Sequence, residues 1–235
     1  MKKSLAADLE KLFKKQAAAV ADRLDANPLE RMPVYTAGEW NDALQTVLRK
    51  HLTKAATLGA ELELASGTVK SYKGLGQRLK SIIKASVDKV LSKGAAIYHK
   101  VNETTGTIID AAVTAARQAG DTAKEVAAKV KDVLTGEAGK ERAADIARTE
   151  TTLGLTTGQE AQRQEWTEDG HDLNKTWNTM GDDAVREMHA DAEGQTVGLT
   201  EHFTVGGEQA YGPGDVGLSA ANRCGCRCWT TTSVA

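Results

Sequence analysis

The sequence predicts an α+β fold in which a mostly helical N-terminal arm precedes a small α+β C-terminal domain. Over the first part of the chain, apolar residues recur at helical spacing and alanine, a strong helix former, is abundant. After Asp169 and Gly170 the pattern changes to short alternating stretches separated by glycine-rich segments, which are typical of strands and turns. We therefore divide the chain into an Ala/Lys-rich arm over residues 1–139 and an α+β domain over residues 140–235.

Proline and glycine residues predict where the first helices of the arm end. Apolar residues three or four apart predict a first helix over residues 5–13, and Pro28 with Pro33 interrupts the pattern that follows. A second helix carries Trp40 near its start and is expected to end near Gly59. The arm therefore begins with two helices separated by a proline-containing connection.

The remaining helices are predicted in the same way from periodicity and end signals. Gly94 is expected to break or end the third helix. Asp121 is a candidate N-cap and Gly136 a candidate C-terminal residue for an Ala-rich helix between them. The expected spans are residues 79–91, 108–119, 123–134 and 141–166.

Short strands are predicted in the last third of the chain. Residues 173–177 alternate as one strand would, and residues 196–203 could supply another. Residues 206–217 are glycine-rich and contain Pro213, which predicts a loop. Large apolar side chains are scarce, so three tryptophans are expected in the core or as a lid of this domain. They are Trp166, Trp177 and Trp229.

Charge is distributed unevenly along the chain. Residues 1–150 hold 25 Lys or Arg against 19 Asp or Glu, whereas residues 151–235 hold 5 against 13. Two regions of opposite sign are expected to meet different partners, or each other. No apolar run approaches the ~20 residues of a membrane span, and the N-terminus lacks the apolar stretch of a signal peptide. We therefore expect no membrane association and folding in the cytosol.

One ordered set of residues in the C-terminal domain carries most of the functional information. An Ile-Ala-Arg-Thr-Glu run at residues 146–150 is followed by a set of spaced residues between Trp177 and Gly194. Phe203, Pro213 and a Cys-Arg-Cys run at residues 226–228 come next. This order and spacing resemble the phage Mu F-type head-morphogenesis family of tailed-phage minor head proteins. Gly225 stands where that family usually has Asn. The signature residues are Arg148, Glu150, Trp177, Asp182, Arg186, His189 and Gly194.

The resemblance implies a non-enzymatic minor capsid protein that takes part in head assembly. The implied partners are the portal protein at the portal vertex, the major capsid protein, or both, with contact to packaged DNA as a further implication. The implied locations are the host cytoplasm during procapsid assembly and then the virion head. No small-molecule substrate is expected. The motifs that carry the resemblance lie after residue 130, and residues 1–130 could be the variable helical region that such proteins place before the shared domain.

Cysteine and histidine residues near the C-terminus form a candidate zinc site. Thiolates and imidazole are good zinc ligands, and Cys226 and Cys228 are close enough in sequence to reach one ion. His189, Cys224 or Asp183 could complete the set. The alternative is that the cysteines are reduced and partly buried, with the histidine hydrogen-bonded locally, since C-x-C departs from the usual spacing of structural zinc sites. No cofactor is required for folding of a chain of this length, so zinc is a candidate ligand only.

Four charged signature residues form a second constellation. We expect Arg148, Glu150, Asp182 and Arg186 to hold each other in an ion-pair network, because arginine binds carboxylates bidentately. The catalytic alternative uses either acid as a general base with His189 as its partner, in a phosphodiesterase or a transferase. No P-loop, nucleophile elbow or H-E-x-x-H motif supports an enzyme, so the structural role is favoured.

A lysine-rich segment is the third feature. Residues 69–101 hold eight Lys or Arg against one acid, Asp88, with apolar positions on one helical face. A solvated lysine face is the simpler interpretation, and a Lys70–Lys100 helix that contacts DNA phosphates or an acidic protein surface is the alternative. The candidate contact residues are Lys70, Lys73, Arg78, Lys80, Lys84, Lys89 and Lys93.

Overall fold

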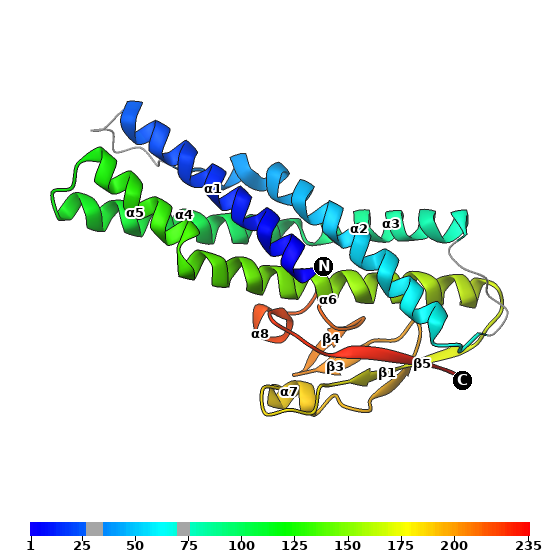
Figure 1. The fold of residues 1–235 in the computed structure, drawn as a ribbon. Coiled ribbons are helices and arrows are strands. Elements are labelled where there is room, and N and C mark those ends of the chain that lie inside the picture. Colours follow the sequence, from blue (N-terminus) through cyan, green and yellow to red (C-terminus); the bar gives the residue numbers. More distant parts are fainter. Residues whose placement is uncertain (27–34, 70–75) are drawn as a thin grey trace. The chain divides into compact units, whose positions relative to one another are not determined.

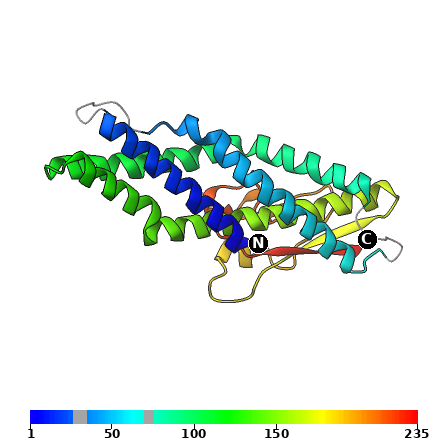
Figure 2. The same ribbon diagram turned by 45° about the horizontal axis from the view of Figure 1, so that its top comes forward.

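The computed structural model of the protein describes residues 1–26, 35–69 and 76–235 (Figures 1 and 2). It confirms the α+β class, with helices over the N-terminal part and antiparallel strands near the C-terminus. Pro28 and Pro33 lie outside the described residues. The helices are α1 (Lys2–Ala26), η1 (Ala37–Trp40), α2 (Asn41–Ala65), α3 (Gln77–Lys93), α4 (Ala95–Gln118), α5 (Ala123–Thr135), α6 (Glu137–Glu168), α7 (Glu187–Ala190) and α8 (Ala220–Arg223). The strands are β1 (Leu173–Asn178), β2 (Thr196–Gly198), β3 (Phe203–Val205), β4 (Glu208–Ala210) and β5 (Trp229–Val234).

The chain forms two compact units that are not consecutive in sequence. The helical unit contains Lys2–Leu48 and Gly94–Ala147, and the C-terminal unit contains Arg49–Lys93 and Arg148–Ala235 together with Met1. Helices α2 and α6 therefore contribute residues to both units. The predicted sequential boundary at residue 140 does not follow this division, and where an independently folding domain begins stays a prediction.

The helical unit is built from amphipathic helices. In this unit α5 packs against both α1 and α4. Helix α5 begins with a capping box: the Thr122 hydroxyl accepts from the Glu125 backbone N–H, and the Glu125 carboxylate accepts from the Thr122 backbone N–H at 2.8 Å. The predicted cap at Asp121 is therefore wrong by one residue, and Asp121 pairs with Lys129 instead. The buried face of α1 contains the predicted residues Leu5, Leu9, Leu12 and Phe13.

The predicted end of the second helix at Gly59 is wrong, because α2 continues to Ala65. A Cβ atom on Gly59 would overlap the backbone carbonyl of Leu155 on α6, and one on Gly158 would overlap the carbonyl of Ala56 on α2. These glycines therefore allow the two helices to approach closely within the C-terminal unit. Gly94, in contrast, separates α3 from α4 as predicted.

The strands form a three-stranded antiparallel sheet in the order β2-β1-β5 and a separate β3-β4 hairpin. The alternation predicted for β1 is confirmed, and its whole length pairs with β5. The strand predicted over residues 196–203 is two strands, β2 and β3. Part of the predicted loop 206–217 is β4, because Gly206 and Gly207 adopt φ values of 57° and 78° and turn the chain back on itself.

Two of the three tryptophans are core residues, as predicted. Trp177 is fully buried with Phe203 and Val205, and Trp166 is fully buried in a neighbouring cluster with Leu173. The prediction for Trp229 is wrong, since this residue begins β5 on the outward side and is 41% exposed. The alternation along β5 instead buries its neighbour, Thr230.

Candidate functional site

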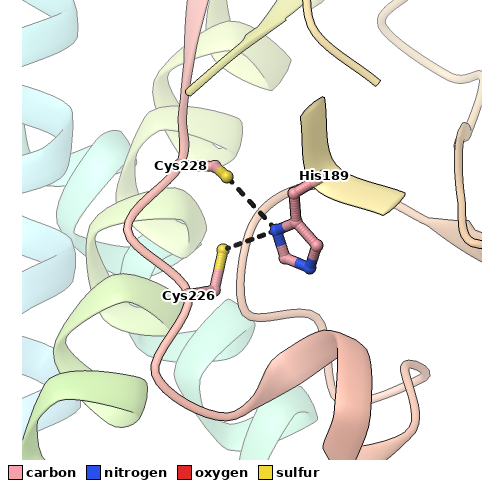
Figure 3. A group of neighbouring side chains, drawn as sticks. All are labelled: His189, Cys226 and Cys228. Atoms are coloured by element: carbon pink, nitrogen blue, oxygen red, sulfur yellow. Dashed lines mark hydrogen bonds between the residues drawn. The ribbon is translucent and has the colours of Figure 1, made fainter. Parts of the chain in front are cut away.

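His189, Cys226 and Cys228 converge at the end of the three-stranded sheet (Figure 3). His189 lies on α7, and the cysteines lie in the segment that joins α8 to β5. The imidazole Nδ1 atom is 3.3 Å from the Cys228 Sγ atom and 3.6 Å from the Cys226 Sγ atom. All three side chains are buried, and their candidate ligand atoms lie within 4.8 Å of one another. The predicted grouping of these three residues is therefore present.

Helix α6 and strand β1 hold the cysteine segment in place. The Thr152 hydroxyl donates to the Cys226 carbonyl at 3.0 Å, and the Gly225 backbone N–H donates to the Thr149 hydroxyl at 2.9 Å. Pairing of β5 with β1 fixes the chain directly after Cys228. On the other side of the site, the Trp177 ring meets the His189 ring edge-on, with the centroids 6.0 Å apart.

Gly225 explains why one of the three cysteines is excluded from the cluster. Its φ of 68° lies in the left-handed region, where the chain turns between Cys224 and Cys226. Cys224 is exposed, and among the described residues it is not part of the group. Glycine adopts this region without steric cost, and Asn tolerates it better than most residues, so either residue type suits the backbone of this turn. The alternative ligand Asp183 is also exposed and outside the group.

The two buried thiols differ in acidity. The hydrogen bond from the Cys228 thiol, assisted by His189, lowers the pKa of the Cys226 thiol to about 5, although burial opposes this shift. The neighbouring Cys226 sulfur and burial both raise the pKa of the Cys228 thiol. When the two thiols together have lost one proton, the negative charge therefore lies on the Cys226 sulfur.

Arg186 holds the other side of the imidazole. Its Nη1 donates to the Cys224 carbonyl at 2.7 Å, and its Nη2 donates to the Asn222 carbonyl at 3.3 Å and lies 3.1 Å from the His189 Nε2 atom. An arginine can only donate, so Nε2 accepts and the imidazole proton resides on Nδ1, facing the sulfur atoms. Arg186 therefore positions both the histidine and the turn before the cysteines.

Two of the charged signature residues pair with arginines outside the predicted set. Glu150 pairs with Arg223 at 2.5 Å, and both side chains are buried. Asp182 accepts two hydrogen bonds from Arg227, at 2.5 and 2.7 Å, and this guanidinium lowers the pKa of the Asp182 carboxyl. Arg223 directly precedes Cys224, and Arg227 lies between Cys226 and Cys228. Their position in this cysteine-containing run is the sequence signal that could have identified them as partners of the two acids.

Two further signature residues, Arg148 and Gly194, lie on α6 and after α7. Arg148 lies half-buried on α6. Gly194 follows the turn after α7 with a φ of 72°, and its N–H donates to the Trp177 carbonyl at 2.9 Å. Gly194 therefore turns the chain from α7 into the strand that pairs with β1.

The lysine-rich segment is not one helix. Lys70 and Lys73 lie outside the described residues, and Lys100 lies on α4, in the other unit. Arg78 pairs with Glu168 and Asp169. At 3.6 residues per turn, the exposed lysines of α3 lie on both sides of its buried stripe rather than on one face. They are Lys80 and Lys84 on one side and Lys89 and Lys93 on the other.

Comparison with known proteins identifies a family. The sequence model described as Phage Mu protein F like protein matches residues 107–231. This span includes every residue of the Glu150–Arg223 and Asp182–Arg227 pairs and of the Cys/His group. No match is found among curated proteins or among solved structures. Because the family match covers more than half of the sequence, the chain belongs to the family of Phage Mu protein F like proteins.

Proposed function

We propose that this protein is a minor head protein of a tailed phage, which takes part in head assembly at the portal vertex. The observation that carries the proposal is the family match over residues 107–231, which supports a role in phage head morphogenesis. Within the described residues, none of the helices combines the length and the apolar character needed to cross a membrane. The proposed partners are the portal protein, the major capsid protein, or both, first in the host cytoplasm and then in the virion head.

A role as a rigid interaction module fits the contacts of the signature residues. Glu150 is buried against Arg223, and Asp182 is bound at both oxygens by Arg227. A general base needs a carboxylate that can reach a substrate proton. Glu150 is buried, and Asp182, although about half exposed, has both oxygens occupied by Arg227. His189 is likewise engaged at both ring nitrogens. These contacts favour a structural over a phosphodiesterase or transferase role.

The structure changes how the assembly contact should be mapped. Deletion of residues 1–100 would remove the predicted arm, but it would also remove Glu63, the buried partner of Arg163, and Gly59, against which α6 packs. Such a deletion would damage the C-terminal unit itself. Surface substitutions avoid this difficulty because they leave both units intact.

The test is co-expression with the portal protein of the same phage, followed by size-exclusion chromatography with mass analysis. Co-elution at a fixed ratio is expected. The exposed pair Lys14→Glu with Lys15→Glu on α1 should reduce it if the arm makes the contact. The matched reversal of two exposed acids, Asp183→Lys with Asp191→Lys, should leave it unchanged. Separate elution from both the portal protein and the major capsid protein would contradict the proposal.

Contact with packaged DNA is a subordinate part of the proposal. The exposed lysines of α3 supply positive charge, but within the described residues no aromatic side chain is interleaved with them along α3. Binding would therefore rest on phosphate contacts alone and would weaken steeply as salt is raised.

A further inference from the structure

We propose that His189, Cys226 and Cys228 bind one thiophilic divalent cation of the zinc type, with a water molecule as the fourth ligand. The proposal concerns a site rather than the assembly role, and either can fail without the other. Its basis is the geometry of the three buried side chains (Figure 3) and a small cavity lined by them.

The two nitrogen–sulfur distances fit the edges of a coordination tetrahedron, and the three candidate ligand atoms all lie within 4.8 Å of one another. With Zn–S near ~2.3 Å and Zn–N near ~2.0–2.1 Å, neighbouring sulfur and nitrogen ligands lie about 3.6 Å apart. The measured Nδ1–Sγ distances are 3.3 Å for Cys228 and 3.6 Å for Cys226. A histidine nitrogen has one in-plane direction for a proton or a lone pair, so it can form a well-aligned hydrogen bond with only one of two sulfurs. Convergence of both sulfurs on Nδ1 is the arrangement expected around a shared ion.

Burial and charge favour the same conclusion. The two sulfurs lie in an apolar cluster with Trp177, Phe203 and Val205. Two thiolates would neutralise a divalent cation, so the ion and its ligands together would carry no net charge in these apolar surroundings. The ion would also join α7 to a segment 37 residues further along the chain, in a domain with few large apolar side chains. Metal binding would therefore stabilise the signature region directly.

The fourth ligand position is assigned to water. A cavity of about 30 Å³ is lined by the three proposed ligands together with Met180 and Val185, among other residues. One water molecule needs ~10–15 Å³ of such volume, so the cavity is large enough for a single one. Cys224 is exposed outside the group.

Arg186 is expected to weaken cation binding at this site. A cation at Nδ1 moves the imidazole proton to Nε2, which faces the Nη2 donor of Arg186 at 3.1 Å. The guanidinium must then give up this contact while it keeps its hydrogen bonds to the carbonyls of Asn222 and Cys224. Zinc-bound histidines usually donate their second N–H to an acceptor, so Arg186 should lower the affinity of the site relative to one with an acceptor there.

The test uses the full chain, purified under reducing conditions, stripped of metal with a chelator and titrated with Co²⁺. A thiolate-to-cobalt charge-transfer band that saturates at one ion per chain is expected, and Zn²⁺ should displace it. Absence of the band from the folded wild-type protein would overturn the proposal without any need for a variant. Metal content of the protein as purified gives a second measurement that does not depend on refolding.

Variants then identify the ligands. Cys226→Ser and Cys228→Ser should each abolish the charge-transfer band, and His189→Asn should weaken binding at least tenfold. Cys224→Ser is the matched control, because it removes an exposed thiol two residues from the site and should leave the stoichiometry unchanged. Loss of the band in Cys224→Ser, with the fold intact by circular dichroism, would overturn the assigned ligand set.

Discussion

Arg163 on α6 and Glu63 on α2 form a buried ion pair at 3.1 Å, with side chains 0% and 3% exposed. The two residues are 100 positions apart, and Arg163 also binds Glu160 and the Thr230 hydroxyl. This pair links the first segment of the C-terminal unit to the segment that carries the family signature. It joins α2 to α6 within the C-terminal unit.

Glu63→Ala should destabilise the protein by about 3–5 kcal/mol, because it leaves the Arg163 charge buried with less compensation. The free energy of unfolding from urea titration is the measurement. Asp88→Ala is the control, since it breaks the pair with Arg49, in which both side chains are about half exposed, and its cost should be much smaller. Equal losses in the two variants would show that the buried pair is not a main link of the unit.

Gly59→Ala should destabilise the protein by about 1–3 kcal/mol, as expected for overpacking. The added Cβ atom would overlap the Leu155 carbonyl, so α2 and α6 would have to separate. Gly38→Ala is the matched control, because a Cβ atom added there would have no neighbouring atom within 4 Å. Thermal denaturation of both variants tests the prediction, and an unchanged midpoint in Gly59→Ala would contradict the close approach of the two helices.

Gly59 also illustrates what the sequence can predict and what it cannot. Periodicity is local, so it predicts the helices and the β1 alternation, and the scarcity of large apolar side chains predicts the burial of Trp166 and Trp177. A glycine that ends a helix and one that allows close packing look the same in sequence, because the difference lies in a segment almost one hundred residues away. The predicted end of α2 is therefore six residues too early.

The candidate site shows the same limit. The Cys/His group can be predicted because the chemistry of the side chains restricts the choice. Exclusion of Cys224 depends on the positive φ of Gly225, and the partner of Glu150 is 73 residues away. Charge alone allows several pairings of the arginines with the acids, and only the tertiary structure distinguishes among them.

Lys175 should make stability depend on pH in the alkaline range. Its side chain is fully buried, donates to the Tyr211 carbonyl at 2.9 Å and lies 3.7 Å from Glu160. Burial lowers the pKa of this ammonium below its usual 10.5, although Glu160 opposes the shift. Between the lowered pKa and 10.5 the unfolded chain therefore binds more protons at this residue than the folded protein does, so stability rises with pH in that window.

The measurement compares urea unfolding of the wild type and Lys175→Met from neutral pH to pH ~10. The unfolding free energy of the wild type minus that of Lys175→Met should increase as the pH rises. Below the lowered pKa both states are protonated at Lys175, so the difference should be constant there. A difference that does not change over the whole range would show that burial does not shift the titration of this residue.

Lys80→Glu with Lys84→Glu tests the proposed DNA contact. Both residues are exposed on α3, so the fold should be unaffected. If they bind phosphates, affinity for duplex DNA falls, and the dependence of log K on log salt flattens by about 0.9 for each phosphate that the variant no longer neutralises. The equivalent charge reversal on the other side of the buried stripe of α3, Lys89→Glu with Lys93→Glu, shows whether one side contributes more to DNA affinity than the other. Absence of wild-type binding at low salt would remove the DNA contact from the proposal.

Glu150 and Asp182 distinguish a structural from a catalytic role for the signature acids. Glu150→Ala leaves Arg223 buried without its carboxylate partner and should cost about 3–5 kcal/mol, whereas Asp182→Ala breaks an exposed pair and should change stability little. Incorporation into heads should fall only as far as the folded fraction falls. It should therefore drop for Glu150→Ala and stay near the wild-type level for Asp182→Ala. Loss of function in Asp182→Ala at unchanged stability would instead indicate that this acid acts in a reaction.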